Sequence, residues 1–541
     1  MTRPLGEMMV TLSKSLRRSL LAFAALSVMA SAAAAQAPEA QKQQTVDLVK
    51  SRAKLAQVIT DQVFSFGELG YQEIETSKYL TALLEKNGFK VERGTSGMPT
   101  AWVARWVSPA GAGPVIAFGS DIDGIPKASQ TPGVAYRKPM IEGAPGHGEG
   151  HNSGQAVNIV AALALKDIMV RDKIPGTLVM WPGVAEELLG AKAFMVRDGV
   201  FKGVDAVIFT HVGDNLDTTW GLARGTGVIS VEYSFSGESA HSAAAPWRGK
   251  SALDAVELMN IGWNMRREHL RPEQRSHYVI VDGGDQPNVV PSKASVWYYF
   301  REIDFANIRK NYEIGNKIAE AAAMMTDTTV TRRVLGAAAP RNFNRPMAEA
   351  AQANMDKVGL PIWTADEQTF AKAVQKLVGA KEEGLATKLK PIEPPPSPPI
   401  SGGSDDIGDI SWIAPTIVIR YPSNIPGLPG HNWSNAISMA TPIAHKGVVA
   451  GAEAVAMTAL DLLTDAKLLA QTKAYFETET LKDEKYQPLI GPTDTPKIEQ
   501  NADIMALYRP GMRKLYYDPA KYPTYLDQLG VKFPELGPKA K

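Results

Sequence analysis

The chain has 541 residues, with 58 Lys or Arg, 57 Asp or Glu and 8 His. Its hydrophobic fraction of 44% and charged fraction of 21% are ordinary for a globular protein, which excludes a chain disordered throughout. The net charge of +1 leaves no basic surplus to recruit nucleic acid, so no nucleic-acid partner is expected. The absence of cysteine excludes disulfides, thiolate zinc sites and cysteine nucleophiles, so any metal site must use histidines and carboxylates.

Residues 1–36 have the plan of a secretory signal peptide. Lys14, Arg17 and Arg18 form a positive segment, Leu20 to Ala30 is apolar, and a run of alanines then offers a cleavage site. The apolar run is shorter than the ~20 residues that span a bilayer, which favours cleavage over a retained anchor. No later stretch looks long and apolar enough to cross a membrane. We expect an exported protein, periplasmic or secreted, with no membrane attachment after cleavage.

Residues 46–225 predict the first part of an α/β domain. Apolar residues recur every three or four positions between about 46 and 90, which indicates helix. Short apolar runs then alternate with helical patterns: the predicted strands cover 100–106, 115–118, 177–181 and 206–210, and the predicted helices cover 155–170 and 191–197. Strands separated by helices indicate a sheet flanked by helices on both faces, here expected to be a mixed sheet.

The order of predicted strands and helices changes over residues 226–336, and the new order predicts an inserted α+β domain. The expected elements are a strand at 228–236, a helix at 251–265, strands at 278–282 and 294–301, a helix at 304–325 and a strand at 328–334. This β-α-β-β-α-β order is ferredoxin-like and has the length of a small domain.

Residues 337–464 are expected to complete the first domain, because helical, strand and loop patterns resume there. Within them, 391–399 is proline-rich and predicts an extended connector. The C-terminal extension, residues 465–541, is polar and rich in Pro and Tyr without clear periodicity. We expect it to wrap the surface rather than to form a domain.

A glycine-rich loop, residues 145–154, carries the strongest chemical signal. His147, Glu149 and His151 occupy alternate positions in it, just before a predicted helix. Glycine lets the backbone approach a ligand closely, and imidazole with carboxylate suits a divalent metal ion. The alternative interpretation is a solvated loop, but two His and a Glu within five residues favour metal binding.

Other candidates follow predicted strands or lie in loops. Glu186 and Glu187 follow one buried strand and His211 ends another, where α/β sheets place their ligands. Each has an ordinary interpretation when taken alone, as an acid at a helix start or as a structural histidine. His241 in the predicted insertion and His431 near the C-terminal end of the first domain are, by themselves, members of polar loops.

Taken together, the motifs resemble a known family. In order along the chain they are Gly97-Met98-Pro99-Thr100-Ala101, Asp121-Ile122-Asp123-Gly124-Ile125-Pro126, residues 146–152, Glu186-Glu187, Asn288-Val289-Val290-Pro291 and Gly408-Asp409-Ile410-Ser411-Trp412. Over about residues 46–464 the chain resembles the dinuclear metallo-aminoacylases and carboxypeptidases of metallopeptidase family twenty. It is most similar to the amidohydrolase branch that contains hippurate hydrolase, plant auxin-conjugate hydrolase and, nearest of all, bacterial aminobenzoyl-glutamate hydrolases.

The resemblance implies a site for two divalent ions, Zn²⁺ or Mn²⁺. His151 and His211 would bind one ion and Glu187 and His431 the other. Glu149 stands where this branch has a bridging cysteine. Other branches bridge with a carboxylate, which is chemically suitable and favours harder ions such as Mn²⁺.

The resemblance also implies the remaining roles. Glu186 would be the general base, and His241 would reach the partner subunit's site and polarise the scissile carbonyl. Asn288 would bind the substrate. Asp123 would not touch the metal itself but would orient a histidine that does. His147 would either support the ligands in the same way or be an ordinary residue of the loop. The inserted domain implies a homodimer.

These implications predict an exported metal-dependent amidohydrolase. It would cleave N-acyl or N-aroyl amino acids, such as aminobenzoyl-glutamate, with a metal-activated water and a glutamate base. The alternatives are a dipeptidase or carboxypeptidase of the same family, a structural subunit of a hetero-oligomer, or a non-catalytic binding protein with a degenerate metal site. The candidates to hold a substrate carboxylate are Arg224, Arg248, Arg301 and Arg420, although a surface ion pair is the simpler interpretation of each. His269, His277 and His445 are expected to be structural or exposed.

Overall fold

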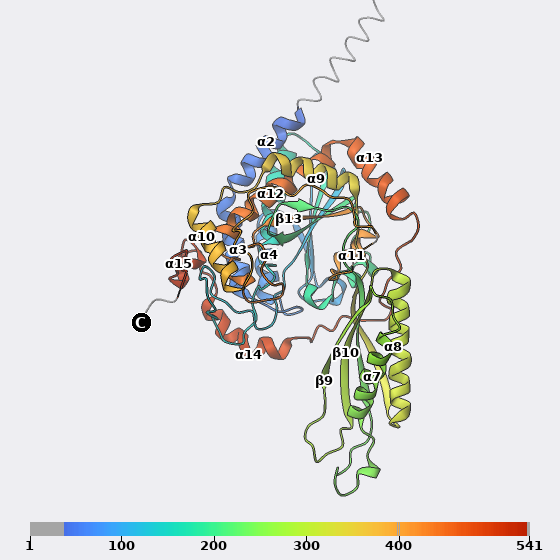
Figure 1. The fold of residues 1–541 in the computed structure, drawn as a ribbon. Helices are drawn as coiled ribbons and strands as arrows, with labels where there is room; N and C mark the ends of the chain where they lie inside the picture. Colours follow the sequence, from blue (N-terminus) through green and yellow to red (C-terminus); the bar gives the residue numbers. More distant parts are fainter. Residues whose placement is uncertain (1–36, 398, 400, 538–541) are drawn as a thin grey trace, which may run out of the picture.

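The computed structural model describes residues 37–397, 399 and 401–537. The predicted signal peptide, residues 1–36, therefore lies outside the described residues. The described chain forms a main α/β domain from which a second, smaller domain projects (Figure 1).

The main domain is built on a seven-stranded mixed sheet. Its strands are β1 (Lys90–Arg93), β2 (Trp102–Val107), β3 (Val115–Asp121), β4 (Thr177–Gly183), β5 (Ala206–Gly213), β6 (Asp217–Thr218) and β13 (Thr416–Pro422). The order is β1-β2-β4-β3-β5-β13-β6. The middle strands β4, β3, β5 and β13 run parallel, whereas β1, β2 and β6 pair antiparallel with their neighbours. The four parallel strands therefore end at one edge, where ligands bind in sheets of this kind.

Helices flank this sheet, as predicted. They are α2 (Ala37–Lys50), α3 (Ala53–Phe66), α4 (Ile74–Lys86), α5 (Gly154–Arg171), α6 (Lys192–Arg197), α9 (Arg345–Val358), α10 (Ala365–Leu377), α11 (Ile407–Ser411) and α12 (Pro442–Thr464). Helices α5 and α12 pack on each other and are buried on nearly all sides. Their many alanines and valines suit a helix that lies inside the core. A separate two-stranded ribbon joins β7 (Gly221–Leu222) to β12 (Asn342–Phe343).

Helix α12 corrects the prediction that no segment after residue 36 could cross a membrane. By length and apolar composition alone it could do so. However, 83% of its most apolar window is buried inside the main domain. The hydrophobicity that resembles a membrane span here serves the packing of a core helix.

The inserted domain has the predicted ferredoxin-like order. It consists of β8 (Gly227–Ser236), α7 (Ala252–Arg267), β9 (Arg275–Asp282), β10 (Lys293–Glu302), α8 (Phe305–Met325) and β11 (Thr329–Ala338). The sheet has the order β11-β8-β10-β9, and every pairing is antiparallel. Alternate residues of β10, such as Val296, Tyr298 and Phe300, are buried against α7 and α8, which gives the domain a core of its own.

The C-terminal extension contains more regular structure than predicted. It forms α13 (Ala466–Tyr475), α14 (Ala502–Met512) and α15 (Tyr525–Leu529). The sequence shows no clear periodicity here because these helices are short and bury few side chains, and because α14 contains Pro510. In Figure 1 the extension runs from α13 past the junction of the two domains to α14 on the main domain.

Candidate metal centre

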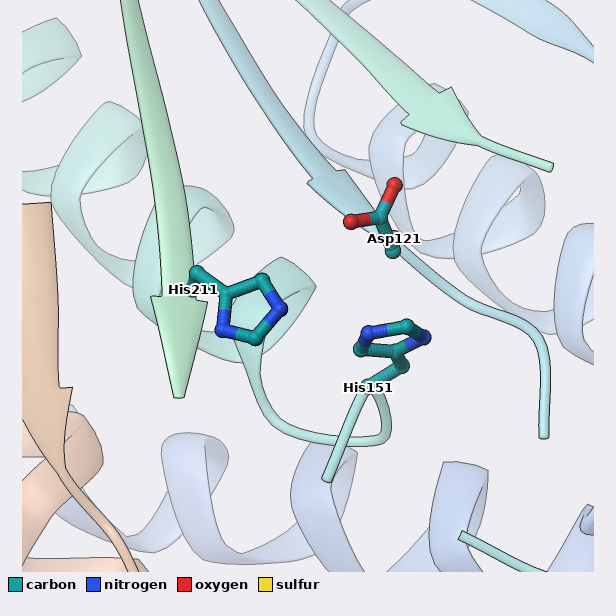
Figure 2. Close-up of side chains that lie close together, drawn as sticks. All are labelled: Asp121, His151 and His211. Carbon is teal, nitrogen blue, oxygen red and sulfur yellow. The ribbon is translucent and has the colours of Figure 1, made fainter. Parts of the chain in front are cut away.

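The fold brings several carboxylates and histidines to the carboxyl edge of the parallel strands. Asp121 ends β3, and His211 lies near the end of β5. Glu186 and Glu187 come directly after β4, and His151 lies in the loop before α5. Figure 2 shows Asp121 and His211 at the ends of two strands, with His151 close by on a loop.

Asp121, His151 and His211 form the first candidate group, with one potential ligand atom of each lying within 4.8 Å of the others. His211 Nδ1 lies 2.8 Å from the carbonyl oxygen of Val212, so Nδ1–H donates to it and Nε2 is left as the free nitrogen. His151 Nδ1 lies 3.3 Å from Asp123 Oδ1. His151 Nε2 and Asp121 Oδ2 are buried and have no hydrogen-bond partner among the described residues.

A second candidate group shares His151 and adds Glu186 and Glu187, again within 4.8 Å. Glu187 Oε2 lies 3.3 Å from His431 Nε2, and Glu149 Oε2 lies 3.8 Å from the same nitrogen. Glu187 Oε1 is buried without a partner in the described chain. The structure therefore brings Glu149, Glu187 and His431 together beside the first group.

A third group contains residues that the sequence analysis did not place in the site. Asp121 and Glu186 lie within 4.8 Å of Asp405, which precedes α11. The fully buried Lys192 Nζ lies 2.6 Å from Asp121 Oδ1 and also contacts Asp406. Lys192 was missed because it lies in a predicted helix, six residues after Glu186, where a lysine normally faces water. Asp121 was noticed only as part of a motif, without a role as a ligand.

The pKa values of the candidate ligands are shifted because several carboxylates are buried close to one another. Burial raises the pKa of Glu187 to about 8, against the attraction of His151. Burial, and then repulsion from Asp121, Asp405 and Glu187, raises the pKa of Glu186 well above its usual range. Burial opposes charge on His151, but its hydrogen bond with Asp123 and the surrounding carboxylates prevail and raise its pKa to about 10. The cluster thus favours added positive charge.

This donor set fits divalent metal ions. We call Asp121, His151, Glu186, Glu187 and His211 the ligand cluster. Three of its buried atoms, on Asp121, His151 and Glu187, have no partner in the described chain, and a buried polar atom without a partner is costly. Imidazole nitrogen and carboxylate oxygen are ligands of Zn²⁺ and Mn²⁺.

Asp123 and His147 lie behind the ligand cluster. Asp123 contacts His151 through Oδ1 and accepts the backbone N–H of Glu187 through Oδ2 at 3.1 Å, which ties two candidate ligands together. His147 is buried, with Nε2 3.1 Å from the carbonyl oxygen of Val63. Burial lowers its pKa to about 4, so the ring is neutral, and His147 belongs to none of the candidate ligand groups.

His241 and Asn288 lie together on the inserted domain and do not line the pocket at the ligand cluster of their own chain. His241 forms an isolated bridge with Val289, and Ser242 N donates to Asn288 O at 3.0 Å. The Nδ1 of His241 accepts the backbone N–H groups of Ala243 and Ala244, each at 3.2 Å. Its proton is therefore on Nε2, and the side chain presents a donor outward.

A pocket of about 500 Å³ opens above Glu149, Glu186, His211 and His431. Four arginines line it, and we call them the arginine wall: Arg275 and Arg301 from the inserted domain, and Arg341 and Arg420 from the main domain. Arg301 donates to Ser404 Oγ at 2.6 Å, while its buried Nε has no partner in the described chain. Burial lowers the pKa of Arg301, as expected for a guanidinium held away from water, yet it stays charged.

Two of the four arginines that the sequence offered as ligands for a substrate carboxylate line this pocket, and two do not. Arg301 and Arg420 line it, Arg224 lines a smaller adjoining cavity, and Arg248 lies in neither. Arg275 and Arg341 were not singled out from the sequence, because no motif surrounds them. His277, which is exposed as expected, also lines the pocket.

Comparisons with known proteins agree with this arrangement. The peptidase dimerisation domain family (M20_dimer) matches residues 225–323. The chain is 33% identical to a p-aminobenzoyl-glutamate hydrolase polypeptide of Escherichia coli (strain K12) over 76% of this chain and 90% of that protein. It is 26% identical to Xaa-Arg dipeptidase of Mus musculus over 81% of this chain and 93% of that protein.

Solved structures extend the likeness to the fold. The aminobenzoyl-glutamate utilization protein of Klebsiella pneumoniae superposes with a TM-score of 0.54 at 17% identity, covering 77% of this chain and 98% of that chain. The 33% identity over most of both chains with the Escherichia coli protein, together with the matched dimerisation domain, makes the chain a member of the M20 peptidase family, whose enzymes are metal-dependent hydrolases of amide bonds.

Proposed function

We propose that this M20 enzyme hydrolyses the amide bond of N-acyl or N-aroyl conjugates of acidic amino acids. The observation that carries the proposal is one pocket with two unlike sides. Glu186 and His211 of the ligand cluster line this pocket, and so do the four arginines of the arginine wall. The first suits amide hydrolysis, and the second suits a product with more than one carboxylate.

Two divalent ions fit the donor set. His151 and His211, with Asp121 beside them, would hold one ion, and Glu187 and His431 the other, with Glu149 within reach of both His431 and the pocket. Bound there, the ions would supply Lewis acidity, which lowers the pKa of water and polarises a carbonyl. Carboxylate at residue 149 favours Mn²⁺ more than a thiolate would.

Glu186 is the proposed general base. It lies within 4.8 Å of His151 and Glu187 yet also lines the open pocket, so its carboxylate can reach both an attacking water and the substrate. In the proposed reaction Glu186 takes a proton from water as the oxygen attacks the amide carbon. It then returns that proton to the leaving nitrogen, so its own charge is restored.

His241 is proposed to act in the site of a second copy of this chain. His241 is exposed on the inserted domain, and its Nδ1 accepts two backbone N–H groups, which leaves Nε2 to act as a hydrogen-bond donor. Such a donor would stabilise the negative charge that develops on the carbonyl oxygen during attack. Asn288, on the adjacent segment, would bind the same substrate, and the functional unit is then a homodimer.

The arginine wall supports the acidic substrate. Guanidinium groups bind carboxylates through paired, charge-assisted hydrogen bonds. One α-carboxylate occupies one or two arginines, whereas a four-arginine wall accommodates a second carboxylate as well. A substrate ending in arginine would meet like charge there, so the dipeptidase activity named for the mouse relative is the weaker candidate.

We also propose that the protein is exported and acts in the periplasm or outside the cell. The support is the sequence of residues 1–36, with its basic start, short apolar run and alanine-rich end. N-terminal sequencing of the protein recovered from the periplasm would test this. A mature N-terminus near residue 37 is expected, whereas an intact Met1 in the cytosol would contradict export.

Metal content paired with activity tests the proposed reaction. Elemental analysis of the purified mature protein should find close to two divalent ions per chain. Hydrolysis of benzoyl-glutamate should stop on chelation and return with Mn²⁺ or Zn²⁺. Full metal loading without hydrolysis of any acyl-amino acid or dipeptide would contradict the proposal, and so would hydrolysis that survives complete removal of metal.

A further inference from the structure

The segment from residue 486 to residue 512, in the C-terminal extension, touches both domains, and we call it the strap. In Figure 1 it leaves the region of α13, passes beside the base of the inserted domain and ends in α14 on the main domain. The similar Klebsiella pneumoniae structure is covered over 98% of its length but aligns with only 77% of this chain. Parts of this chain therefore lie outside the shared fold, and their role is open.

The first half of the strap is fixed to the inserted domain. Leu489 and Ile490 are each 5% exposed and pack in that domain's core. Lys497 Nζ lies 2.5 Å from Glu232 Oε2 on β8, and Arg333 Nη1 on β11 lies 2.6 Å from Glu499 Oε1. Apolar anchoring and ion pairs together hold this half against strands β8 and β11.

The second half of the strap is fixed to the segment from Glu68 to Glu73, between α3 and α4. Arg509 pairs with Glu68 and donates from Nη2 to the carbonyl oxygen of Gln72 at 2.8 Å. Gln72 Nε2 donates back to the carbonyls of residues 498 and 500, each at 3.1 Å. Asn501 Nδ2 donates to the carbonyl oxygen of Gly70 at 3.2 Å.

The pairing with Arg509 matters because Glu68 is fully buried. Burial raises the pKa of Glu68, and the attraction of Arg509 opposes that shift. Glu68 also accepts hydrogen bonds from the backbone N–H groups of Glu75 and Thr76 and from the Thr76 hydroxyl, but Arg509 is its charged partner. A buried carboxylate that loses its charged partner is strongly unfavourable, so Arg509 helps to fix where Glu68 lies. The backbone of Glu68 also contacts the loop that follows β3. Gly124 N, next to Asp123, donates to the carbonyl oxygen of Glu68 at 2.7 Å.

The other end of the same segment contacts the loop that carries Glu186 and Glu187. Glu73 Oε1 accepts the backbone N–H of Ala185 at 2.8 Å, and Tyr71 Oη donates to the carbonyl oxygen of Gly190 at 2.5 Å. Ala185 has a left-handed backbone with φ of 49°, an unusual conformation that needs such support. The contact is so close that a Cβ at Gly70 would lie 2.8 Å from Ala185 Cα.

We infer that the strap is a positioning element for the catalytic loop, and that Arg509 is its main positioning residue. The chain of contacts runs from the strap through Glu68 and Gln72 to Glu73, and from there to Ala185, next to Glu186. Packed segments of this kind transmit displacements rather than absorb them. The inference rests on the proposed function for its effect on rate, but the contacts can be tested without any substrate.

The test compares Arg509→Gln with Arg513→Gln in the full-length protein. Arg513 is the matched control, because it forms an exposed ion pair with Glu75, at 2.9 Å, and has no contact with residues 68–73 among its side-chain bonds. Amide hydrogen exchange is measured on peptides covering residues 68–73 and 184–190. We expect Arg509→Gln to speed exchange in both peptides on the order of tenfold, while Arg513→Gln leaves both unchanged.

Gln72→Ala keeps the inference testable if Arg509→Gln fails to fold, because it removes the two hydrogen bonds from Gln72 Nε2 to the strap without leaving a buried charge. It should also speed exchange at 184–190. Unchanged exchange there in the folded variants would overturn the inference. So would an equal rise across the whole main domain, because Arg509 would then serve general stability.

Kinetics separate positioning from binding. With metal content unchanged, Arg509→Gln should lower kcat about 10- to 100-fold and leave KM within about threefold, since only the geometry of the base is disturbed. Arg509→Lys should recover part of the loss, because it restores the charge but not both hydrogen bonds. An unchanged kcat in an active enzyme would contradict the inference. If no substrate is turned over by the parent enzyme, the proposed function fails while the exchange measurement still decides the role of the strap.

Discussion

The ligand cluster and the arginine wall share one pocket but differ in charge, burial and origin. The cluster consists of buried acids and histidines from the ends of adjacent parallel strands, and several of its atoms lack partners in the described chain. The wall consists of arginines from both domains, most of them already bonded to protein. This difference indicates that the ligand cluster serves the hydrolytic reaction and that the arginine wall serves the binding of substrate carboxylates. Substitutions should therefore affect kcat and KM separately.

The largest expected effect is on the chemical side. Glu186→Gln keeps the size of the side chain but removes the base, so kcat should fall about 10³-fold or more with metal content unchanged. The matched variant Glu187→Gln alters a proposed ligand one residue away and should lose metal as well as rate. Turnover and elemental analysis of both proteins measure this. Activity retained in Glu186→Gln would remove Glu186 from the mechanism.

The next effect concerns the contribution of the inserted domain to chemistry. His241→Ala should lower kcat about 10²-fold without changing metal content, because a donor to the carbonyl oxygen is lost. If His241 acts across a dimer, mixing refolded His241→Ala and Glu186→Gln chains should restore about a quarter of the parent activity, since each mixed dimer has one complete site. No recovery in confirmed mixed dimers would show that His241 does not act in trans.

A smaller effect is expected on the recognition side. Arg301→Gln removes one charge of the arginine wall, so KM for benzoyl-glutamate should rise about 10- to 100-fold while kcat changes little. KM for benzoyl-leucine should change far less, and this contrast assigns the effect to the side-chain carboxylate. Arg332→Gln, an exposed arginine paired with Glu320 outside the pocket, is the control and should match the parent. Equal losses for both substrates would contradict a role in recognition.

The smallest expected effect is on stability and concerns a buried carboxyl group outside the pocket, where no metal is proposed. Glu453 on α12 is 5% exposed, and burial raises its pKa to about 7 against the attraction of Lys50. The folded protein then binds this proton more tightly than the unfolded chain, so stability falls as pH rises from about 4.5 to about 7.

Glu453→Gln should remove that loss. The variant should be more stable than the parent by roughly 1–3 kcal/mol at pH 8, and the difference should vanish near pH 4. Denaturant unfolding at both pH values measures it. Glu349→Gln, in an exposed ion pair on α9, is the control and should leave the pH dependence unchanged. A gain that is equal at both pH values would contradict the raised pKa.

The ligand cluster was largely predictable from the sequence, and the arginine wall was not. The glycine-rich loop alone pointed to His151, whereas Glu186, Glu187 and His211 had ordinary interpretations when taken alone and received roles only through the family resemblance. Asp121 received no role as a ligand. The wall arginines have no such local signal. They meet because β9 and β10 of the inserted domain face the end of β13, which depends on how the two domains pack.

The fold was likewise predictable only in part. The parallel strands and the inserted domain follow from apolar runs and alternation that are visible in the sequence. Strand β1 was missed because its four residues are almost all charged and exposed, so nothing marks it as a strand except its partner β2. Lys192 was missed because its burial requires two aspartates, Asp121 and Asp406, which are distant in the sequence.

The most direct test of the central claim is the kcat/KM of the metal-loaded enzyme for three substrates that share one acyl group: benzoyl-glutamate, benzoyl-leucine and benzoyl-arginine. The account predicts that the glutamate conjugate is preferred over the leucine conjugate by about 10²-fold or more, and that the arginine conjugate is the poorest. Equal values, or a preference for benzoyl-arginine, would contradict the proposal that the arginine wall selects an acidic amino acid.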